Sequence, residues 1–257
     1  MARIVITGSS EGLGLMAGER LAGGGHEVIL HARSDRRAED ARRALPQAKA
    51  VVIGDLSSLA GMRSVADQVN ALGRPDAVIH NVGVGYREPR RILTDDGFSQ
   101  LFAVNTLAPY VLTALIERPD RLVYLSSGLH CGGDPDLSDL QWEKRPWNGM
   151  QAYSDTKLHD AQLAFAIARR WPEVRSNAVE PGWVATRMGG AGATDDLAQG
   201  PVTQAWLAVS DDRAAQASGR YFFHQDIREP APAAERTDLQ DGLLDYCEAL
   251  SGIALPA

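Results

Sequence analysis

A glycine-rich turn between a short apolar run and a helical segment constrains this chain more than any other feature of its sequence. The run RIVITG (3–8) is typical of a buried strand, and SSEGLG follows it directly. Gly8, Gly12 and Gly14 allow a tight turn and let a pyrophosphate approach the start of the next helix, where free N–H groups favour an anion. Because a strand precedes these glycines and a helix follows them, the sequence predicts a dinucleotide-binding βαβ unit.

Strand-like and helical segments alternate along the rest of the chain. Apolar strand-like runs occupy 3–8, 27–32, 48–54, 76–81, 121–127, 175–182 and 219–225, and helical segments occupy 12–23, 35–44, 58–71, 97–117, 151–170 and 196–209. This alternation predicts an α/β fold, a Rossmann-type doubly wound parallel sheet of about seven strands with helices on both faces. In such sheets, ligands bind beyond the carboxyl ends of the strands. We expect residues 1–257 to form a single domain that ends in an amphipathic helix near 235–251.

Composition argues against several classes of protein. The chain has 257 residues and a net charge of -7, which disfavours nucleic acid or an anionic membrane as the main partner. Its two cysteines, Cys131 and Cys247, lie far apart in no metal-ligand spacing, so we expect neither a metal site nor a disulfide framework. No signal peptide and no run long enough to span a membrane is apparent. We therefore expect a cytoplasmic protein that acts on a small molecule.

The end of the second strand bears on the choice between NAD and NADP. An NAD site places a carboxylate there to bind the ribose 2′-hydroxyl. In LHARSDRR the strand-end position is Ala32, followed by Arg33, and an arginine suits a 2′-phosphate, so NADP(H) is favoured over NAD(H). Asp35 is the competing candidate, although it or Ser34 is typical of the cap of the next helix. Glu11, inside the glycine turn, argues mildly against a nearby phosphate.

A tyrosine and a lysine four residues apart suggest catalysis. Tyr153 and Lys157 lie in the helical segment 151–170 and therefore share one helix face. A nearby ammonium lowers the pKa of a phenol, which makes it a workable proton donor or acceptor. Lysine also suits hydrogen bonding to the nicotinamide ribose, because its ammonium is a compact group with three donors. The spacing alone does not exclude a chance pair in an ordinary helix.

Two motifs resemble the short-chain dehydrogenase/reductase family: T-G-x-x-x-G-x-G at 7–14 and Y-x-x-x-K at 153–157. The resemblance covers essentially the whole chain and implies an NAD(P)-dependent oxidoreductase. It implies that Ser127, the second serine of YLSSG, holds the substrate carbonyl. Asn105 of VNTLAPY would position a water that links Lys157 to solvent, and Tyr153 would act as the acid or base.

The same resemblance implies a set of cofactor contacts. Asp55 of GDLSS would bind the adenine, and Thr186 would fix the nicotinamide carboxamide. NVGVG (81–85) departs from the usual N-N-A-G, because Val82 replaces the second asparagine. The full predicted set is Gly8, Ser10, Gly12, Leu13, Gly14, Arg33, Asp55, Leu56, Asn81, Gly83, Tyr153, Lys157, Pro181, Gly182, Val184 and Thr186.

Two segments, 128–150 and 187–202, are predicted to form the substrate pocket, the second as a mobile flap. The first resembles retinol dehydrogenases and protochlorophyllide-reductase-like members. Its candidate pocket residues, together with one from the loop after the sixth strand, favour a bulky apolar or aromatic ketone or alcohol, although each taken singly is more typical of packing than of substrate contact: His130, Trp142, Trp147 and Trp183.

Three functions stay open at this point. They are reduction of a ketone or oxidation of an alcohol, reduction of an enone C=C bond, and a non-catalytic NADP-binding sensor or scaffold. Relatives often pair through their two long helices, so we expect a homodimer or homotetramer that uses 97–117 and 151–170.

Overall fold

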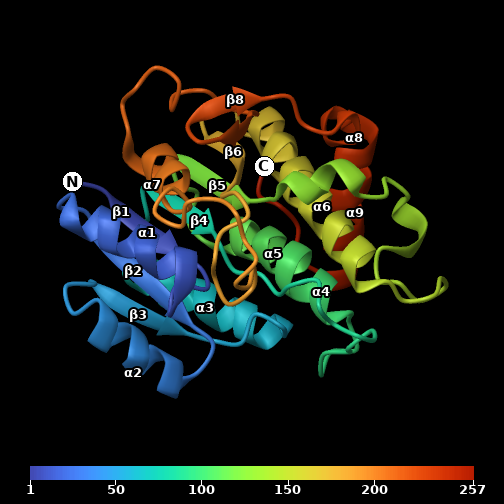
Figure 1. Cartoon of the computed structure of the whole chain (residues 1–257), viewed down its shortest axis with the longest axis horizontal. Helices are drawn as coiled ribbons and strands as arrows, with labels where there is room; N and C mark the ends of the chain where they lie inside the picture. Colours follow the sequence, from blue (N-terminus) through green and yellow to red (C-terminus); the bar gives the residue numbers. More distant parts are fainter.

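One eight-stranded sheet lies between two layers of helices in the computed structural model, which describes residues 1–257 (Figure 1). The strand order is β3-β2-β1-β4-β5-β6-β7-β8, and all neighbours pair in parallel except β7 and β8. The strands are β1 (Arg3–Ile6), β2 (Glu27–Ala32), β3 (Ala50–Ile53), β4 (Ala77–His80), β5 (Arg121–Leu125), β6 (Arg175–Glu180), β7 (Tyr221–Phe223) and β8 (Asp226–Arg228). The predicted doubly wound parallel sheet is confirmed.

The eighth strand is a difference from the prediction. It joins β7 through a tight turn in which His224 and Gln225 have φ angles of 50° and 67°. Two successive residues with positive φ are typical of the turns that close antiparallel hairpins. The strand itself is DIR, three exposed residues without an apolar run, so its sequence carries no strand signal.

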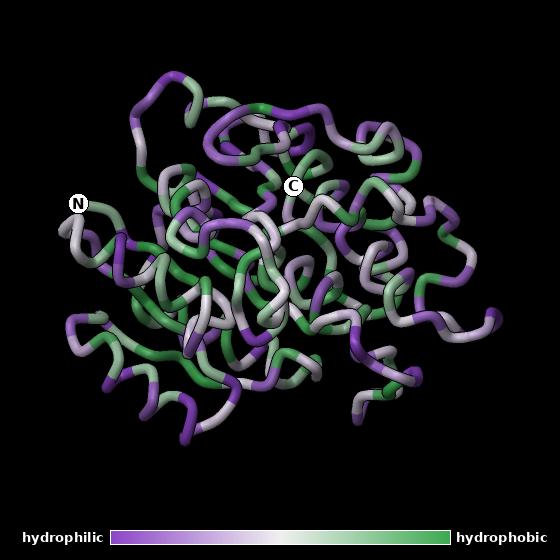
Figure 2. The backbone as a smooth tube through the Cα atoms, in the orientation of Figure 1, coloured by the Kyte–Doolittle hydropathy of each residue, from purple (hydrophilic) through white to green (hydrophobic).

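Helices cover both faces of the sheet and bury two separate apolar clusters. One face carries α1 (Gly12–Gly23), α2 (Asp35–Ala44) and α7 (Val202–Val209), and the other carries α3 (Leu59–Ala71), α5 (Ala108–Leu115), α6 (Gly149–Arg170) and α9 (Thr237–Ser251). Figure 2 shows hydrophobic strands at the centre and a hydrophilic outer face on α2. Burial on both faces explains why the strands are continuous apolar runs.

The apolar pattern predicts one helix over 97–117, but the structure does not have a single regular helix there. The segment consists of α4 (Gln100–Phe102), a π-helical turn (Ala103–Leu107) and α5. Pro109 lacks an N–H and cannot donate to the carbonyl of Asn105, so the hydrogen-bond ladder changes register there. Similarly, α7 begins only at Val202 rather than at 196, because Pro201 disfavours helical backbone in the residue before it.

The carboxyl-terminal segment packs against its own chain. After the short helix α8 (Pro232–Glu235), α9 lies along α6, where all residues from Ala152 to Ile167 are buried. The final residues extend this contact: the Tyr110 hydroxyl donates to the Ile253 carbonyl at 2.7 Å, and the Trp171 indole donates to the Pro256 carbonyl at 3.1 Å. The helix predicted near 235–251 is therefore present and covers α6. None of the helices has the length and apolar content needed to cross a lipid bilayer.

Candidate active site

The glycine turn lies at the carboxyl ends of β1 and β4, the point at which the strand order reverses direction. Gly8 has a φ of +61°, and a Cβ atom there would lie 2.8 Å from the Val82 Cα. A Cβ on Gly14 would lie 2.5 Å from the side-chain nitrogen of Asn81. Both positions therefore require glycine for the turn to close against the loop after β4. Parallel sheets bind ligands in the crevice at this switch point.

Asn81 holds the glycine turn in place. Its side-chain amide donates to the carbonyls of Thr7 and Gly8 at 2.9 and 3.0 Å. The Thr7 hydroxyl accepts in return from the backbone N–H groups of Asn81 and Val82, both at 3.0 Å. The sequence assigns Asn81 to the cofactor, and the structure assigns its side chain to shaping the cofactor turn.

His31 is a site residue that sequence reasoning missed. Its Nδ1 accepts from the Gly8 N–H at 2.9 Å, so the proton lies on Nε2, which donates to the Gly54 carbonyl at 2.9 Å. Burial lowers the pKa of His31, which keeps the ring neutral as these two bonds require. The ring thereby links the glycine turn to the end of β3. A histidine within the buried run EVILHA was the available signal.

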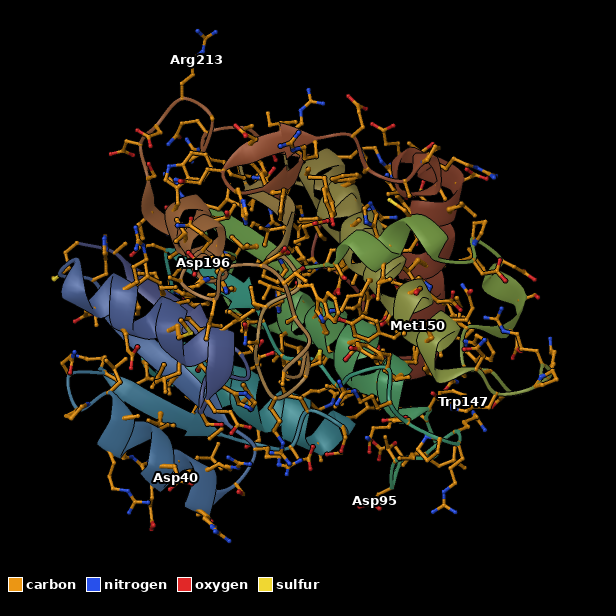
Figure 3. All side chains as sticks on the ribbon, viewed as in Figure 1. Asp40, Asp95, Trp147, Met150, Asp196 and Arg213 are labelled. Carbon is orange, nitrogen blue, oxygen red and sulfur yellow. The ribbon has the colours of Figure 1, made fainter.

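Arginines gather where β2 meets α2. Arg33 is exposed at the end of β2, Ser34 is the capping residue of α2, and Asp35 begins that helix. An open hollow of about 350 Å³ at this place is lined by Arg33, Ser34, Arg36, Arg37 and Asp40. Figure 3 labels Asp40 at the outer side of α2. The acidic side chain that argued against a phosphate is neutralised, because Glu11 pairs with Arg37 at 3.0 Å.

Four other predicted cofactor residues lie around this crevice. Ser10 and Leu13 are partly exposed, in the glycine turn and the first turn of α1. Asp55 is exposed beyond β3, and one of its carboxylate oxygens accepts from the Ser57 N–H at 2.9 Å. The Leu56 side chain is 2% exposed and belongs to the apolar core, so this residue offers a ligand only its backbone.

Tyr153 and Lys157 lie buried in the amino-terminal half of α6, which begins after an Asn148 cap. The Lys157 Nζ lies 5.6 Å from the centre of the Tyr153 ring, so the two side chains share one face as predicted. Ser127 follows β5 and is partly exposed, and its hydroxyl accepts from the Leu129 N–H at 3.3 Å. The Lys157 ammonium donates to the Leu125 carbonyl at 2.7 Å, two residues before Ser127, so the end of β5 lies beside this face of α6.

The net direction of the Tyr153 pKa differs from the prediction. Burial raises the pKa of Tyr153, and the opposing charge of Lys157 offsets this only in part. The sequence could not show how deeply the phenol is buried. In the structure, Tyr153 is 7% exposed, with Tyr86 packed edge-on at 5.6 Å. The phenol is therefore held in its protonated form, which suits donation of a proton.

Asn105 lies in the π-helical turn and faces the loop after β4. Its side-chain oxygen accepts from the Val84 N–H at 2.8 Å, and its nitrogen donates to the Val84 carbonyl and to the Thr156 hydroxyl at 3.1 Å each. A Cβ on Gly83 would lie 3.6 Å from Asn105 Oδ1 and 3.8 Å from Lys157 Nζ. The structure thus brings Asn105, Gly83 and Lys157 together, with the Asn105 amide fixing the loop.

Two of the four predicted pocket residues are committed to internal contacts. His130 is 2% exposed, and its Nδ1 and Nε2 bond to the Ser127 carbonyl and the Ala231 N–H at 2.8 and 3.0 Å. Trp142 is 6% exposed and lies under the Arg145 guanidinium, with its indole bonded to Asp155 at 3.1 Å. The sequence predicted that both residues line the substrate pocket. In the structure they stabilise the segment after β5, because tertiary packing buries them.

The other two tryptophans lie nearer the surface. Trp147 donates to the Glu88 carbonyl at 2.9 Å and packs edge-on against Trp142 in the cluster that contains Tyr153, whereas Trp183 is 50% exposed. Figure 3 shows Trp147 and Met150 at the amino-terminal end of α6. Met150, near the start of α6, is also exposed, at 45%.

The segment between β6 and α7 passes over the site, and Figure 1 shows it in orange in front of the sheet. Gly182 has a φ of +83°, beside Pro181, and the buried Val184 accepts from the Thr186 N–H at 2.7 Å. Further along, the Tyr153 hydroxyl donates to the Met188 sulfur at 3.7 Å. Sequence reasoning missed Met188, which has no polar group to mark it.

Known proteins resemble this chain along its whole length. Residues 2–119 match the family model described as short chain dehydrogenase. The short-chain dehydrogenase chyC of Penicillium rubens is 42% identical over 262 residues, and the match covers 100% of each chain. Retinol dehydrogenase 13 of Homo sapiens is 30% identical over 291 residues, which cover 99% of this chain and 86% of that protein. A crystal structure from Mycobacterium paratuberculosis gives a TM-score of 0.85 at 27% identity, covering 100% of this chain and 96% of the other.

A doubly wound sheet with a glycine turn at its switch point, and a buried tyrosine and lysine beyond its strands, defines an NAD(P)-dependent oxidoreductase. The chain belongs to the short-chain dehydrogenase/reductase family. The match with retinol dehydrogenase 13 agrees with the resemblance of the segment 128–150.

Proposed function

We propose that this enzyme transfers hydride between NADP(H) and a carbonyl or alcohol, with reduction of a bulky apolar or aromatic ketone as its reaction. The observation that carries the proposal is the position of Tyr153 and Lys157 on one face of α6, where the Lys157 ammonium donates to the Leu125 carbonyl, two residues before Ser127. The bound nicotinamide supplies the hydride. The protein supplies orientation, hydrogen bonds and the proton.

Each catalytic side chain has one task. The Ser127 hydroxyl donates to the substrate carbonyl oxygen and stabilises the negative charge that develops there. The Tyr153 hydroxyl donates its proton to the same oxygen. Lys157 donates to the ribose hydroxyls and favours the phenolate that remains. The substrate oxygen replaces the Met188 sulfur at the Tyr153 hydroxyl, so Met188 moves when substrate binds.

The arginines at the end of β2 support the preference for NADP(H). A ribose 2′-phosphate brings about two negative charges to this region, and the hollow there is lined by Arg33, Arg36 and Arg37. Glu11 does not oppose the phosphate strongly, because Arg37 and Arg187 pair with it at 3.0 and 3.5 Å.

The apolar side chains near Tyr153 support a bulky apolar substrate. Tyr86, Trp147 and Met188 pack against the cluster that contains Tyr153, and Met150 is 45% exposed close by. These groups offer aromatic faces and polarisable sulfur, which suit an aromatic or polycyclic ring.

The Tyr153→Phe variant tests the mechanism. We expect ketone reduction to fall by a factor of about 10² or more, because the proton donor is lost, while NADPH binding changes little. The matched control is Tyr110→Phe, a buried tyrosine whose hydroxyl donates to the Ile253 carbonyl outside the site. It should lose stability but keep its turnover. Retention of most activity in Tyr153→Phe would refute the mechanism, and product analysis on an enone separates C=O from C=C reduction.

The expected homodimer or homotetramer gains no support from the face of α6. Residues Ala152 to Ile167 are buried within one chain, and α9 packs along this helix. A copy that paired through α6 would have to displace α9 first. We therefore propose that any homo-oligomer uses another surface, which is tested by light scattering together with crosslinks mapped to residues outside α6.

A further inference from the structure

Lys157 has a buried counter-ion one helical turn further along α6. The Asp160 carboxylate lies 2.7 Å from the Lys157 Nζ, and the two residues are 2% and 4% exposed. Removing two charges from water is costly, and the cost is offset only where the pair is close and hydrogen-bonded. The mechanism proposed above assigns no role to Asp160. Burial raises the pKa of Asp160 to about 7, so its carboxylate is charged on the alkaline side of neutrality, in contact with Lys157.

The ammonium of Lys157 is fixed from two directions. It donates to Asp160 Oδ2 and to the Leu125 carbonyl, both at 2.7 Å. Leu125 ends β5, two residues before Ser127, and the Ser126 hydroxyl donates to the Lys157 carbonyl at 2.7 Å. These bonds join the helix that carries the proton donor to the strand end that carries Ser127. An ammonium has three donors, so one N–H stays free for the cofactor.

The other titratable groups around Asp160 do not replace Lys157 as its cation. Burial raises the pKa of Tyr124 of β5, and the charge of Asp160 raises it further, so this phenol stays neutral. Tyr124 shares a buried hydrogen-bond chain with Thr113 and with His80 of β4. His159, bonded to Thr106 of the π-helical turn, has its pKa lowered to about 3 by burial and is also neutral. Lys157 thus supplies the positive charge that contacts Asp160.

We infer that Asp160 is a positioning residue for Lys157. Its carboxylate holds the Lys157 ammonium against the end of β5 and offsets the positive charge that Tyr153 experiences. This inference rests on the proposed oxidoreductase mechanism. The ammonium by itself favours the phenolate of Tyr153, and the adjacent carboxylate disfavours it. The pKa of Tyr153 agrees with this inference. Burial raises it most, the charge of Lys157 lowers it, and the charge of Asp160 raises it again.

The test is the pH dependence of ketone reduction by Asp160→Asn in the full-length protein with NADPH. With the carboxylate gone, the ammonium acts on the phenol without compensation. We expect the basic limb of kcat, which follows loss of the Tyr153 proton, to move down by roughly one pH unit, because a nearby carboxylate no longer disfavours the phenolate. Asp160→Ser, a smaller neutral replacement, tests the same charge if Asp160→Asn does not fold, and Asp160→Glu should restore the original limb.

Asp155→Asn is the matched control. Asp155 is a buried carboxylate on the same helix, but it pairs with Arg145 at 2.8 Å and not with Lys157. Its variant should lose stability and keep the wild-type pH profile. The inference is overturned if a folded neutral variant at Asp160 retains the wild-type limb, or if Asp155→Asn shifts it equally.

A second readout separates this inference from the proposed function. Ultraviolet difference titration, with Tyr153→Phe as the reference, reports the phenolate of Tyr153 without any turnover. If no ketone is reduced, the proposed function fails, and the downward shift in Asp160→Asn is still measured. If ketones are reduced and the titration does not shift, only the role of Asp160 fails.

Discussion

Replacement of Gly14 by alanine should weaken the glycine turn and cofactor binding together. The new Cβ would lie 2.5 Å from the Asn81 side-chain nitrogen, 2.8 Å from the Gly8 carbonyl oxygen and 2.9 Å from the Ser9 Cα. Two of these atoms are backbone, so the turn itself must move. Moving Asn81 also breaks its two hydrogen bonds to Thr7 and Gly8.

The structure allows the cost to be estimated. Two lost hydrogen bonds cost about 1 kcal/mol each, and overpacking costs about 1–3 kcal/mol more. We expect Gly14→Ala to lose about 3–5 kcal/mol of unfolding free energy, or to relieve the strain by opening the turn. An opened turn that loses even ~3 kcal/mol of binding raises the Kd for NADPH by roughly 100-fold.

Urea unfolding and calorimetric titration with NADPH measure these two effects. Gly23→Ala is the matched control, because Gly23 ends the same helix and a Cβ there meets no atom within 4 Å. It should stabilise the protein by up to about 1 kcal/mol and leave NADPH binding unchanged. If Gly14→Ala binds NADPH within threefold of the wild type and unfolds normally, the argument that the turn requires glycine is wrong.

The arginine hollow and the buried histidines give two further predictions. Arg33→Asp should weaken NADPH binding and improve NADH as donor, which a comparison of kcat/KM for both cofactors measures; an unchanged ratio would show that Arg33 does not contact the 2′-phosphate. Burial lowers the pKa values of His80 and His159 to about 3, so the unfolded chain, with a histidine pKa near 6.5, binds protons first. The contribution of the two neutral histidines to the free energy of unfolding is therefore complete above about pH 6.5. It is lost as the pH falls toward 3, by as much as ~4 kcal/mol for each histidine. Urea unfolding across this range should show a smaller pH dependence in His159→Gln, and an equal slope would contradict the assignment.

The sequence predicted most of the fold because its signals are local. The glycine turn and the apolar runs marked the strands from β1 to β7, and the spacing of Tyr153 and Lys157 indicated their shared face. A helix fixes that spacing whatever surrounds it.

The remaining features depend on contacts between distant segments. The pKa of Tyr153 is raised because other elements bury the phenol, and His130 is internal because Ala231 bonds to it from 101 residues away. Asp160 carried no signal, since an acidic residue in an amphipathic helix is most often exposed. These roles depend on which residues lie close together in the fold, and residue type alone does not reveal this.

The hairpin at the end of the sheet also has a consequence for how copies of the protein behave at high concentration. An uncovered strand edge presents unpaired N–H and C=O groups to which a neighbouring chain can add as a further strand. Here the outermost strand is β8, three exposed residues long, with charged Asp226 and Arg228 on either side of Ile227. Short, charged edges resist such addition. The hairpin thus protects the apolar β7 from edge-to-edge aggregation.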